Sequence, residues 1–225
     1  MRCITSANVA CGVHAGGVVT MRETVLLARE HGVAVGAHPS FPDREQFGRR
    51  EMQLPSAEIV DLVIRQIEAL ARIASNEGIR LQHVKPHGAL YNVAVRDRRV
   101  ADAIARGVVS VDRSLVLLGL PRSELVAAAQ SAGLRTAGEA FADRAYRADG
   151  TLVPRTEPGA VIHNPEEVLA RIVSLAARPD IETICLHGDT PGAAELASKI
   201  RAALEAAKFE VKNLSSPRLG HQRAP

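Results

Sequence analysis

HVKPHGALYN, His83 to Asn92, is the stretch around which the chain is organised. It opens as the end of an apolar strand. A proline and a glycine then interrupt strand pairing, and they lie among three polar side chains, Lys85, His87 and Tyr91. A strand that ends in this kind of polar chemistry indicates a functional site.

Four other stretches have the same form, an apolar run followed by polar residues with glycine or proline. They are SANVACGVHAG (6–16), VAVGAHPSFPD (33–43), GEAFADRAY (138–146) and TICLHGDT (183–190). If the five strands are parallel neighbours, their carboxyl ends lie on one face, where α/β proteins bind ligands. The side chains that this arrangement would bring together are His14, His38, His87, Asp143 and His187.

Apolar runs typical of strands alternate with segments of helical periodicity. The predicted strands cover residues 8–11, 33–37, 79–85, 114–119, a run from 134, 181–187 and 209–214; the predicted helices cover 18–30, 55–77, 97–107, a segment after 121, one from 164 and one from 190 to 207. Ser56 is the predicted N-cap of the helix 55–77, and Asn164 with Pro165 is the predicted N-cap and first-turn proline of a later helix. The apolar face of the helix 55–77 consists of Ile59, Leu62, Val63, Ile67, Leu70, Ile73 and Ala74. This alternation predicts an α/β fold with a parallel sheet of about seven strands, either a barrel or a doubly wound sheet. We expect one domain over residues 1–214 and a disordered tail over 215–225.

The composition favours chemistry on a small molecule. The net charge is only +3, and no basic stripe is interleaved with aromatic residues, so nucleic acid is not an expected partner. The three cysteines have no CxxC spacing, which indicates neither a disulfide framework nor a cysteine metal site and is consistent with a reducing cytoplasm. No run is long and apolar enough to predict a membrane span, and no signal peptide is recognised.

Histidines at the strand ends are the candidate catalysts. A lone histidine there is more often a packing residue, but four that converge with two aspartates, Asp143 and Asp189, favour a catalytic site. Asp189 precedes a helix and could instead be its cap. His87 is the preferred general base or acid, because imidazole titrates near neutral pH. Lys85, next to it, could neutralise a phosphate or a carboxylate. The predicted catalytic residues are His14, His38, Lys85, His87, Asp143 and His187.

Arginines in the loops beyond these strands are candidates for binding an anionic substrate. A guanidinium group binds a carboxylate or a phosphate through two hydrogen bonds, although each arginine could equally be structural. The predicted substrate-binding residues are Asn8, Arg49, Arg50, Tyr91, Arg144 and Arg155.

The stretches 6–16, 32–50, 83–92, 141–155 and 185–193 together resemble the LamB/YcsF family, and the resemblance runs from about residue 5 to 211. It implies a β/α barrel related to the glycoside hydrolase and deacetylase superfamily. It also implies a role in a three-component 5-oxoprolinase, the ATP-dependent opening of 5-oxoproline to glutamate, in which this chain would be the first component and act together with subunits B and C. ATP therefore follows from the resemblance alone, since the sequence contains no GxxxxGK[ST] phosphate loop.

Two positions depart from the pattern that the resemblance implies. Family members have a strand and an acidic motif, roughly DLNCDLGE, before SANVACG, whereas this sequence begins MRCITSANVACG. Gly17 stands where the family usually has aspartate. We therefore expect an N-terminally shortened chain whose barrel lacks its first strand.

Two alternative functions stay open. The first is a stand-alone metal-dependent deacetylase, because neutral imidazoles with one carboxylate are a usual zinc set. No HxH or HExxH spacing occurs, so no metal ligand is assigned, and a divalent metal is left as an alternative. The second is an inactive binding subunit produced by the shortening. Association with further copies of the chain is also left open.

Overall fold

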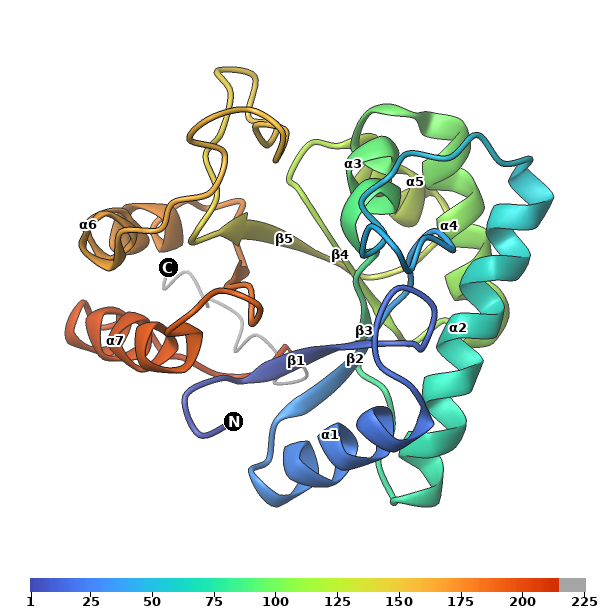
Figure 1. Ribbon diagram of the computed structural model, residues 1–225, viewed down its shortest axis with the longest axis horizontal. Coiled ribbons are helices and arrows are strands. Elements are labelled where there is room, and N and C mark those ends of the chain that lie inside the picture. The colour runs from blue at the N-terminus through green and yellow to red at the C-terminus, as the bar shows by residue number, and fades with distance from the viewer. Residues whose placement is uncertain (215–225) are drawn as a thin grey trace, which may run out of the picture.

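Six parallel strands form the centre of the structure, a computed structural model that describes residues 1–214 (Figure 1). The tail that was predicted to be disordered lies outside these residues. The strands pair in chain order, and the sheet curls into a half-barrel. They are β1 (Ser6–Ala10), β2 (Ala34–His38), β3 (His83–Val84), β4 (Val116–Gly119), β5 (Thr136–Phe141) and β6 (Thr183–Cys185).

Helices connect the strands and cover the outside of the half-barrel (Figure 1). A parallel pair needs a crossover connection, and most of these connections contain a helix. The helices are α1 (Val18–Glu30), α2 (Ser56–Asn76), α3 (Gly88–Arg96), α4 (Arg98–Val111), α5 (Glu124–Ser131), α6 (Pro165–Ala176) and α7 (Ala193–Ala206). None of the described helices is long and apolar enough to cross a membrane.

The predicted strand count needs correction. We expected a barrel of about seven strands that lacks its first strand, whereas the described residues form six strands in a half-barrel, and β1 and β6 are the unpaired edges of the sheet. The predicted strand over residues 209–214 does not form. Phe209 and Val211 pack instead against the apolar cluster between α6 and α7, and Leu214 packs against strands β4 and β5. The prediction that residues 1–214 form one domain stays a prediction.

Helix α3 was missed, because Gly88 was interpreted only as an interruption of the strand. Gly88 is the first residue of that helix, and its φ of +56° suits glycine. Asp97 separates α3 from α4 and accepts hydrogen bonds from the backbone N–H groups of Arg99 and Val100. Strand β3 is shorter than predicted, although the N–H of Gln82, just before it, still donates to the Val35 carbonyl.

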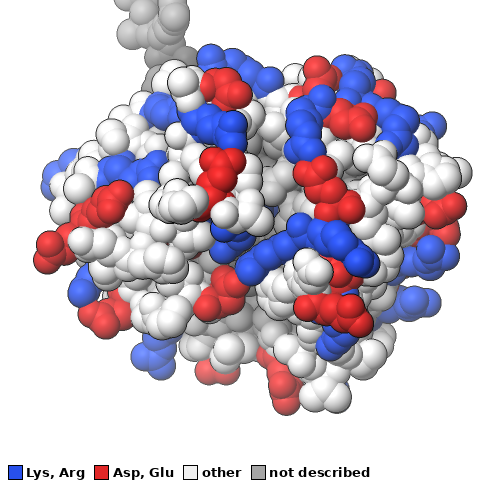
Figure 2. Space-filling view, turned by 45° about the horizontal axis from the view of Figure 1, so that its top comes forward, with Lys and Arg blue, Asp and Glu red and all other residues white. Residues whose placement is uncertain are grey.

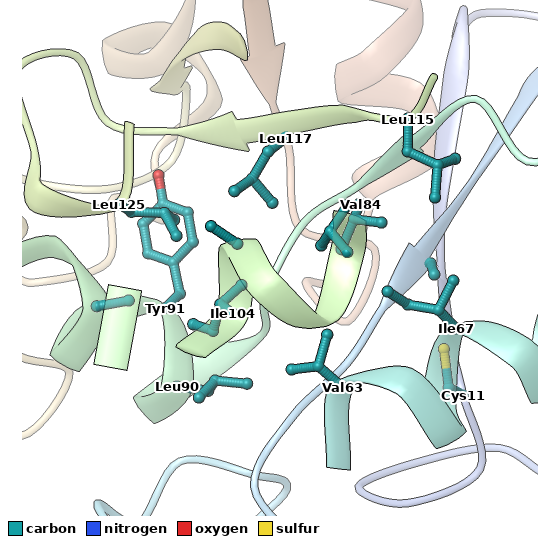
Figure 3. Packing of buried hydrophobic residues seen from close by; sticks show 14 of the residues in the cluster. Cys11, Val63, Ile67, Val84, Leu90, Tyr91, Ile104, Leu115, Leu117 and Leu125 are labelled. Carbon is teal, nitrogen blue, oxygen red and sulfur yellow. The ribbon is translucent and has the colours of Figure 1, made fainter. Parts of the chain in front are cut away.

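The core between α2, α4 and the sheet follows the predicted apolar face of α2. Ile73 is partly buried, and the other members of that face, Ile59, Leu62, Val63, Ile67, Leu70 and Ala74, are buried. Figure 3 shows Val63 and Ile67 within this core. Gly107 of α4 lets the two helices approach closely, since a Cβ atom there would lie 2.9 Å from a methyl carbon of Val63. Burial of each large aliphatic side chain stabilises the fold by about 1.5–3 kcal/mol. Ser56, the predicted N-cap of α2, is instead its first residue, and Pro55 occupies the cap position.

Candidate active site

A cavity of about 990 Å³ occupies the inside of the half-barrel and reaches its open side. Residues of both edge strands line it, and helix α7 contributes Ile200 and Leu204. On the face turned forward in Figure 2, charged side chains of both signs surround a depression in the surface. Because the sheet is parallel, the polar segments that follow the strands gather at one end of this cavity.

The structure brings most of the predicted site residues together. Those that line the cavity are Asn8, His14, His38, Arg49, Lys85, His87, Tyr91, Arg144, Arg155 and His187. Asp143 lies behind His187, fully buried. Arg50 is outside the lining; its side chain is largely exposed and lies 3.8 Å from the carboxylate of Asp43.

His187 and Asp143 form a dyad. The carboxylate of Asp143 accepts a hydrogen bond from Nδ1 of His187 at 2.9 Å and a second from the backbone N–H of the same residue at 3.2 Å. Burial alone would raise the pKa of Asp143, but these hydrogen bonds outweigh burial and lower it. An ionised Asp143 fixes the proton of His187 on Nδ1. The Nε2 atom, which has no hydrogen-bond partner among residues 1–214, is left as an acceptor.

His14 has the same tautomer as His187, with a donor at Nδ1 and an acceptor at Nε2. A serine hydroxyl orients its ring in place of a carboxylate. The hydroxyl of Ser40 donates to the Phe41 carbonyl, so its oxygen accepts from Nδ1 of His14 at 2.8 Å. Burial, with Arg49 and Arg44 nearby, lowers the pKa of His14 to about 4. This histidine is therefore neutral at pH 7, and its Nε2 atom has no hydrogen-bond partner in the described part of the chain.

All four ring nitrogens of His38 and His87 face other protein atoms. Nδ1 of His38 donates to the Lys85 carbonyl at 2.6 Å, and its Nε2 lies 3.0 Å from Nδ1 of His87. Nε2 of His87 lies 2.8 Å from the carbonyl oxygen of Phe47. Burial and the neighbouring His14 lower the pKa of His87 to about 3. These contacts favour a packing role, while the catalytic role of His87 stays a prediction.

Two glycines let the loop after β2 close over these histidines. The N–H of Ala89, at the start of α3, donates to the Gly48 carbonyl at 3.0 Å. A Cβ atom on Gly88 would lie 2.4 Å from that carbonyl oxygen, so no side chain fits there. Gly48 itself has a φ of +69° and lies against His14 and His87. The loop thus forms one wall of the site through backbone contacts.

Lys85 lies deeper in the cavity, in a buried ion pair with Glu139. Its Nζ atom is 2.6 Å from Oε1 of Glu139 and 2.9 Å from Sγ of Cys185. Burial by itself would lower the pKa of Lys85, but these neighbours outweigh burial and raise it. Burial also raises the pKa of Cys185 to about 12, so that side chain is a thiol at pH 7. The carboxylate of Glu139 therefore holds Lys85 in its charged form.

Three arginines concentrate positive charge at the mouth of the cavity. Arg49 pairs with Asp189 at 2.7 Å, which joins the loop after β2 to the loop after β6. Burial and the neighbouring Arg155 lower the pKa of Arg144 to about 10, and burial with Arg49 lowers that of Arg155. Arg144 also donates to the Ala160 carbonyl and braces the loop that contains it. An anion bound among these groups would relieve their mutual repulsion.

Sequence reasoning missed several residues of the site. Glu139 is an inward-facing acid on an otherwise apolar strand, and this signal was available in the sequence. Ser40, Cys185 and His83 gave no usable signal, since their roles depend on partners far along the chain. Nε2 of His83, for example, lies 3.0 Å from the amide oxygen of Asn8 and holds that side chain at the cavity. Asp189, whose place before a helix suggests a cap, pairs with Arg49 instead.

The titratable groups do not assemble into a set of metal ligands. Within residues 1–214, no group of three or more His, Cys, Asp and Glu side chains is placed to hold a metal ion. The ring nitrogens of His38 and His87 already face other protein atoms. The donor set therefore does not fit a catalytic metal, and no step of the proposed chemistry is assigned to one.

The sequence profile of the LamB/YcsF family matches residues 1–218. The chain belongs to the LamB/YcsF family. This LamB/YcsF protein is similar to the lactam utilization protein from Thermus thermophilus, whose crystal structure superposes with a TM-score of 0.87 at 44% sequence identity. That alignment covers 94% of this chain and 89% of the other.

A more distant likeness concerns the fold alone. A putative cellobiose-phosphate cleavage protein from Enterococcus faecalis superposes on this LamB/YcsF protein with a TM-score of 0.51 at 14% identity. The alignment covers 85% of this chain and 81% of the other. It supports the α/β half-barrel architecture.

Because several histidines are buried in neutral form, we expect the free energy of unfolding to fall in mild acid. The pKa values of His14 and His83 fall to about 4, below the value of about 6.5 in an unfolded chain. The unfolded state then binds more protons than the folded state as the pH falls below about 6.5. Each such histidine should reduce the free energy of unfolding by about 1.4 kcal/mol per pH unit until its folded pKa is reached.

The measurement is urea unfolding at several values between pH 7.5 and pH 5. The midpoint should fall steadily across this range, and His14→Gln should make the dependence shallower. His163→Gln, at an exposed position, is the matched control and should leave the slope unchanged. A pH-independent midpoint for the unsubstituted protein would show that these histidines are not buried in neutral form.

Proposed function

We propose that this protein is the ring-opening component of a 5-oxoprolinase, an enzyme that hydrolyses the ring amide of 5-oxoproline to give glutamate. The observation that carries the proposal is the His187–Asp143 dyad, whose free Nε2 atom lies in a cavity with arginines at its mouth. The similarity to a protein described as a lactam utilization protein supports the same class of substrate.

His187 is the proposed general base. Its Nε2 atom takes a proton from a water molecule, and the water oxygen forms a bond to the carbonyl carbon of the activated ring. The bond between that carbon and the ring nitrogen then breaks, and the imidazolium returns the proton to the nitrogen. The product still has the phosphoryl group on its former carbonyl oxygen, and a second water molecule hydrolyses this acyl phosphate to glutamate and phosphate. Asp143 stabilises the imidazolium and keeps the neutral ring in the tautomer that can accept a proton.

The arginines supply the proposed anion sites. Arg155 matches the carboxylate of 5-oxoproline, which is planar and accepts two parallel hydrogen bonds. Nε and Nη2 of Arg144 already donate to the Ala160 and Val153 carbonyls, which leaves its Nη1 atom to donate to the same carboxylate. A second anion, the phosphoryl group of an activated substrate, is proposed to bind at Arg49. In the structure, the carboxylate of Asp189 occupies that position as the partner of Arg49. ATP is the proposed co-substrate, and its hydrolysis supplies the free energy for opening an unactivated amide.

Partner subunits B and C are part of this proposal. The residues of this chain fit single anionic groups, and its sequence contains no phosphate loop for a whole nucleotide. We therefore assign nucleotide binding to the partners and ring opening to this chain. A stand-alone metal-dependent deacetylase is less well supported, because the described side chains do not form a metal site.

The test is glutamate formation from 5-oxoproline in the presence of ATP. It should be measured for this chain alone, for B with C, and for all three together. Activity is expected only in the triple mixture. Full activity of the lone chain without ATP would overturn the assignment to a complex. A triple mixture without activity, formed from folded subunits, would favour an inactive binding subunit.

A further inference from the structure

The inner part of the cavity holds a polar cluster that the proposed chemistry at His187 does not use. Its members are Lys85, Tyr91 and Glu139, from the segments of β3, α3 and β5. Their exposed fractions are only 4%, 3% and 2%, yet all three side chains line the cavity. They are therefore screened from bulk water and form part of the wall of the half-barrel's cavity.

Polar atoms of this cluster lack hydrogen-bond partners. Oε1 of Glu139 pairs with Lys85, while Oε2 of the same carboxylate is buried and has no partner among the described residues. The hydroxyl of Tyr91 is likewise buried; the carboxylate of Glu139 lies close to it, but no hydrogen bond with full geometry joins the two groups among the described residues. The ammonium group of Lys85 has three hydrogens, and the contacts with Glu139 and Cys185 account for two of them.

These atoms present one acceptor beside two donors. Oε2 of Glu139 accepts a hydrogen, whereas Lys85 and the protonated Tyr91 each have a hydrogen to donate. Burial, with Glu139 close by, raises the pKa of Tyr91 well above its usual value, so its hydroxyl keeps the proton at neutral pH. Buried polar atoms are almost always hydrogen-bonded in folded proteins, so such a set is typical of a site completed by a ligand.

We propose that Lys85, Tyr91 and Glu139 form a subsite for the cis-amide edge of a cyclic substrate. In a small lactam the ring forces N–H and C=O onto the same edge, so one group meets the carboxylate while the other meets the ammonium or the phenol. A linear secondary amide is trans and presents these groups on opposite sides. The ligand class is therefore lactams, cyclic imides and cyclic ureas. This inference rests on the proposed function, of which it specifies the substrate recognition.

The subsite adjoins the dyad through one shared aromatic ring. Phe141, at the end of β5, has its ring centroid 4.5 Å from Nζ of Lys85, 5.7 Å from the ring of Tyr91 and 5.8 Å from the ring of His187. A ligand held by Glu139 and Lys85 thus lies in the same chamber as His187, with Phe141 as its common wall.

The experiment is calorimetric binding to the full chain, which needs no partner subunit or turnover. The ligands are 5-oxoproline, its N-methyl derivative, and N-acetylglycine as a linear amide with a carboxylate. We expect 5-oxoproline to bind and both other ligands to bind at least about tenfold more weakly, since each removes a hydrogen bond to a charged group. Pyrrolidin-2-one, a lactam without a carboxylate, separates the subsite from the arginines.

Variants test the residues themselves. Tyr91→Phe and Glu139→Gln should each weaken 5-oxoproline binding, and Glu139→Gln should abolish the preference over the N-methyl derivative. Glu195→Gln, the same change at an exposed position of α7, is the matched control and should leave binding unchanged. The comparison of ligands on the unsubstituted protein remains decisive if a variant fails to fold.

The outcomes separate this inference from the proposed function. Equal binding of 5-oxoproline and its N-methyl derivative would overturn the subsite, even if glutamate is formed with B and C. Binding of pyrrolidin-2-one without glutamate formation would support the subsite and contradict the 5-oxoprolinase assignment. If no lactam binds to the folded chain, the subsite is overturned.

Discussion

His187→Ala is expected to lower the turnover of 5-oxoproline by about 10²- to 10⁴-fold, the usual contribution of a general acid–base residue. The variant loses the free Nε2 atom that the dyad presents to the cavity. The fold should survive, because the backbone N–H of residue 187 still donates to the carboxylate of Asp143. KM should change little, since the arginines that are proposed to bind the substrate are unaffected.

The measurement is steady-state glutamate formation with ATP and subunits B and C. Asp143→Asn is the companion variant, and its amide would donate to Nδ1 of His187 and hold the ring in the wrong tautomer. It should lower kcat by a similar factor while urea unfolding shows a folded protein. His163→Ala, which removes an exposed imidazole, is the control. An unchanged kcat in His187→Ala would show that His187 is not the general base. His14 and His87 would then be the candidates for that role.

Lys85→Met should have the largest effect on stability, a loss of about 3–5 kcal/mol in the free energy of unfolding. The ion pair with Glu139 has a 2.6 Å contact, and both side chains are almost fully buried. Loss of Lys85 leaves the carboxylate of Glu139 buried without its counter-charge. The change would therefore affect folding as well as turnover, whereas the sequence alone indicated only a catalytic role for Lys85.

The double variant Lys85→Met/Glu139→Leu tests the cause. Both replacements keep the approximate volume and remove the charges together, so most of the lost stability should return. Arg96→Met breaks an exposed pair with Glu51 and should cost less than about 1 kcal/mol. If the double variant is as unstable as Lys85→Met, the buried charge is not the reason. The double variant should also fail to bind lactams.

Much of the architecture could be predicted from local patterns. The apolar face of α2, the N-cap at Asn164 with proline after it, and the polar strand ends all follow from the spacing of residue types within one segment. The number of strands was not predictable in this way. It depends on whether residues 209–214 find a strand to pair with, and that requires a neighbour from a distant part of the chain.

The sequence by itself determined that histidines, a lysine and arginines would meet at one end of a parallel sheet, because strand direction and loop position suffice for that. Only the tertiary structure decided which of these side chains have a nitrogen atom without a hydrogen-bond partner in the described residues. Asp143 orients His187 across 44 residues, and Lys85 meets Cys185 across 100. The physical reason is that the tautomer of an imidazole and the charge of a buried lysine depend on hydrogen-bond partners within about 3 Å. Packing brings those partners together from separate strands, so no local pattern encodes them.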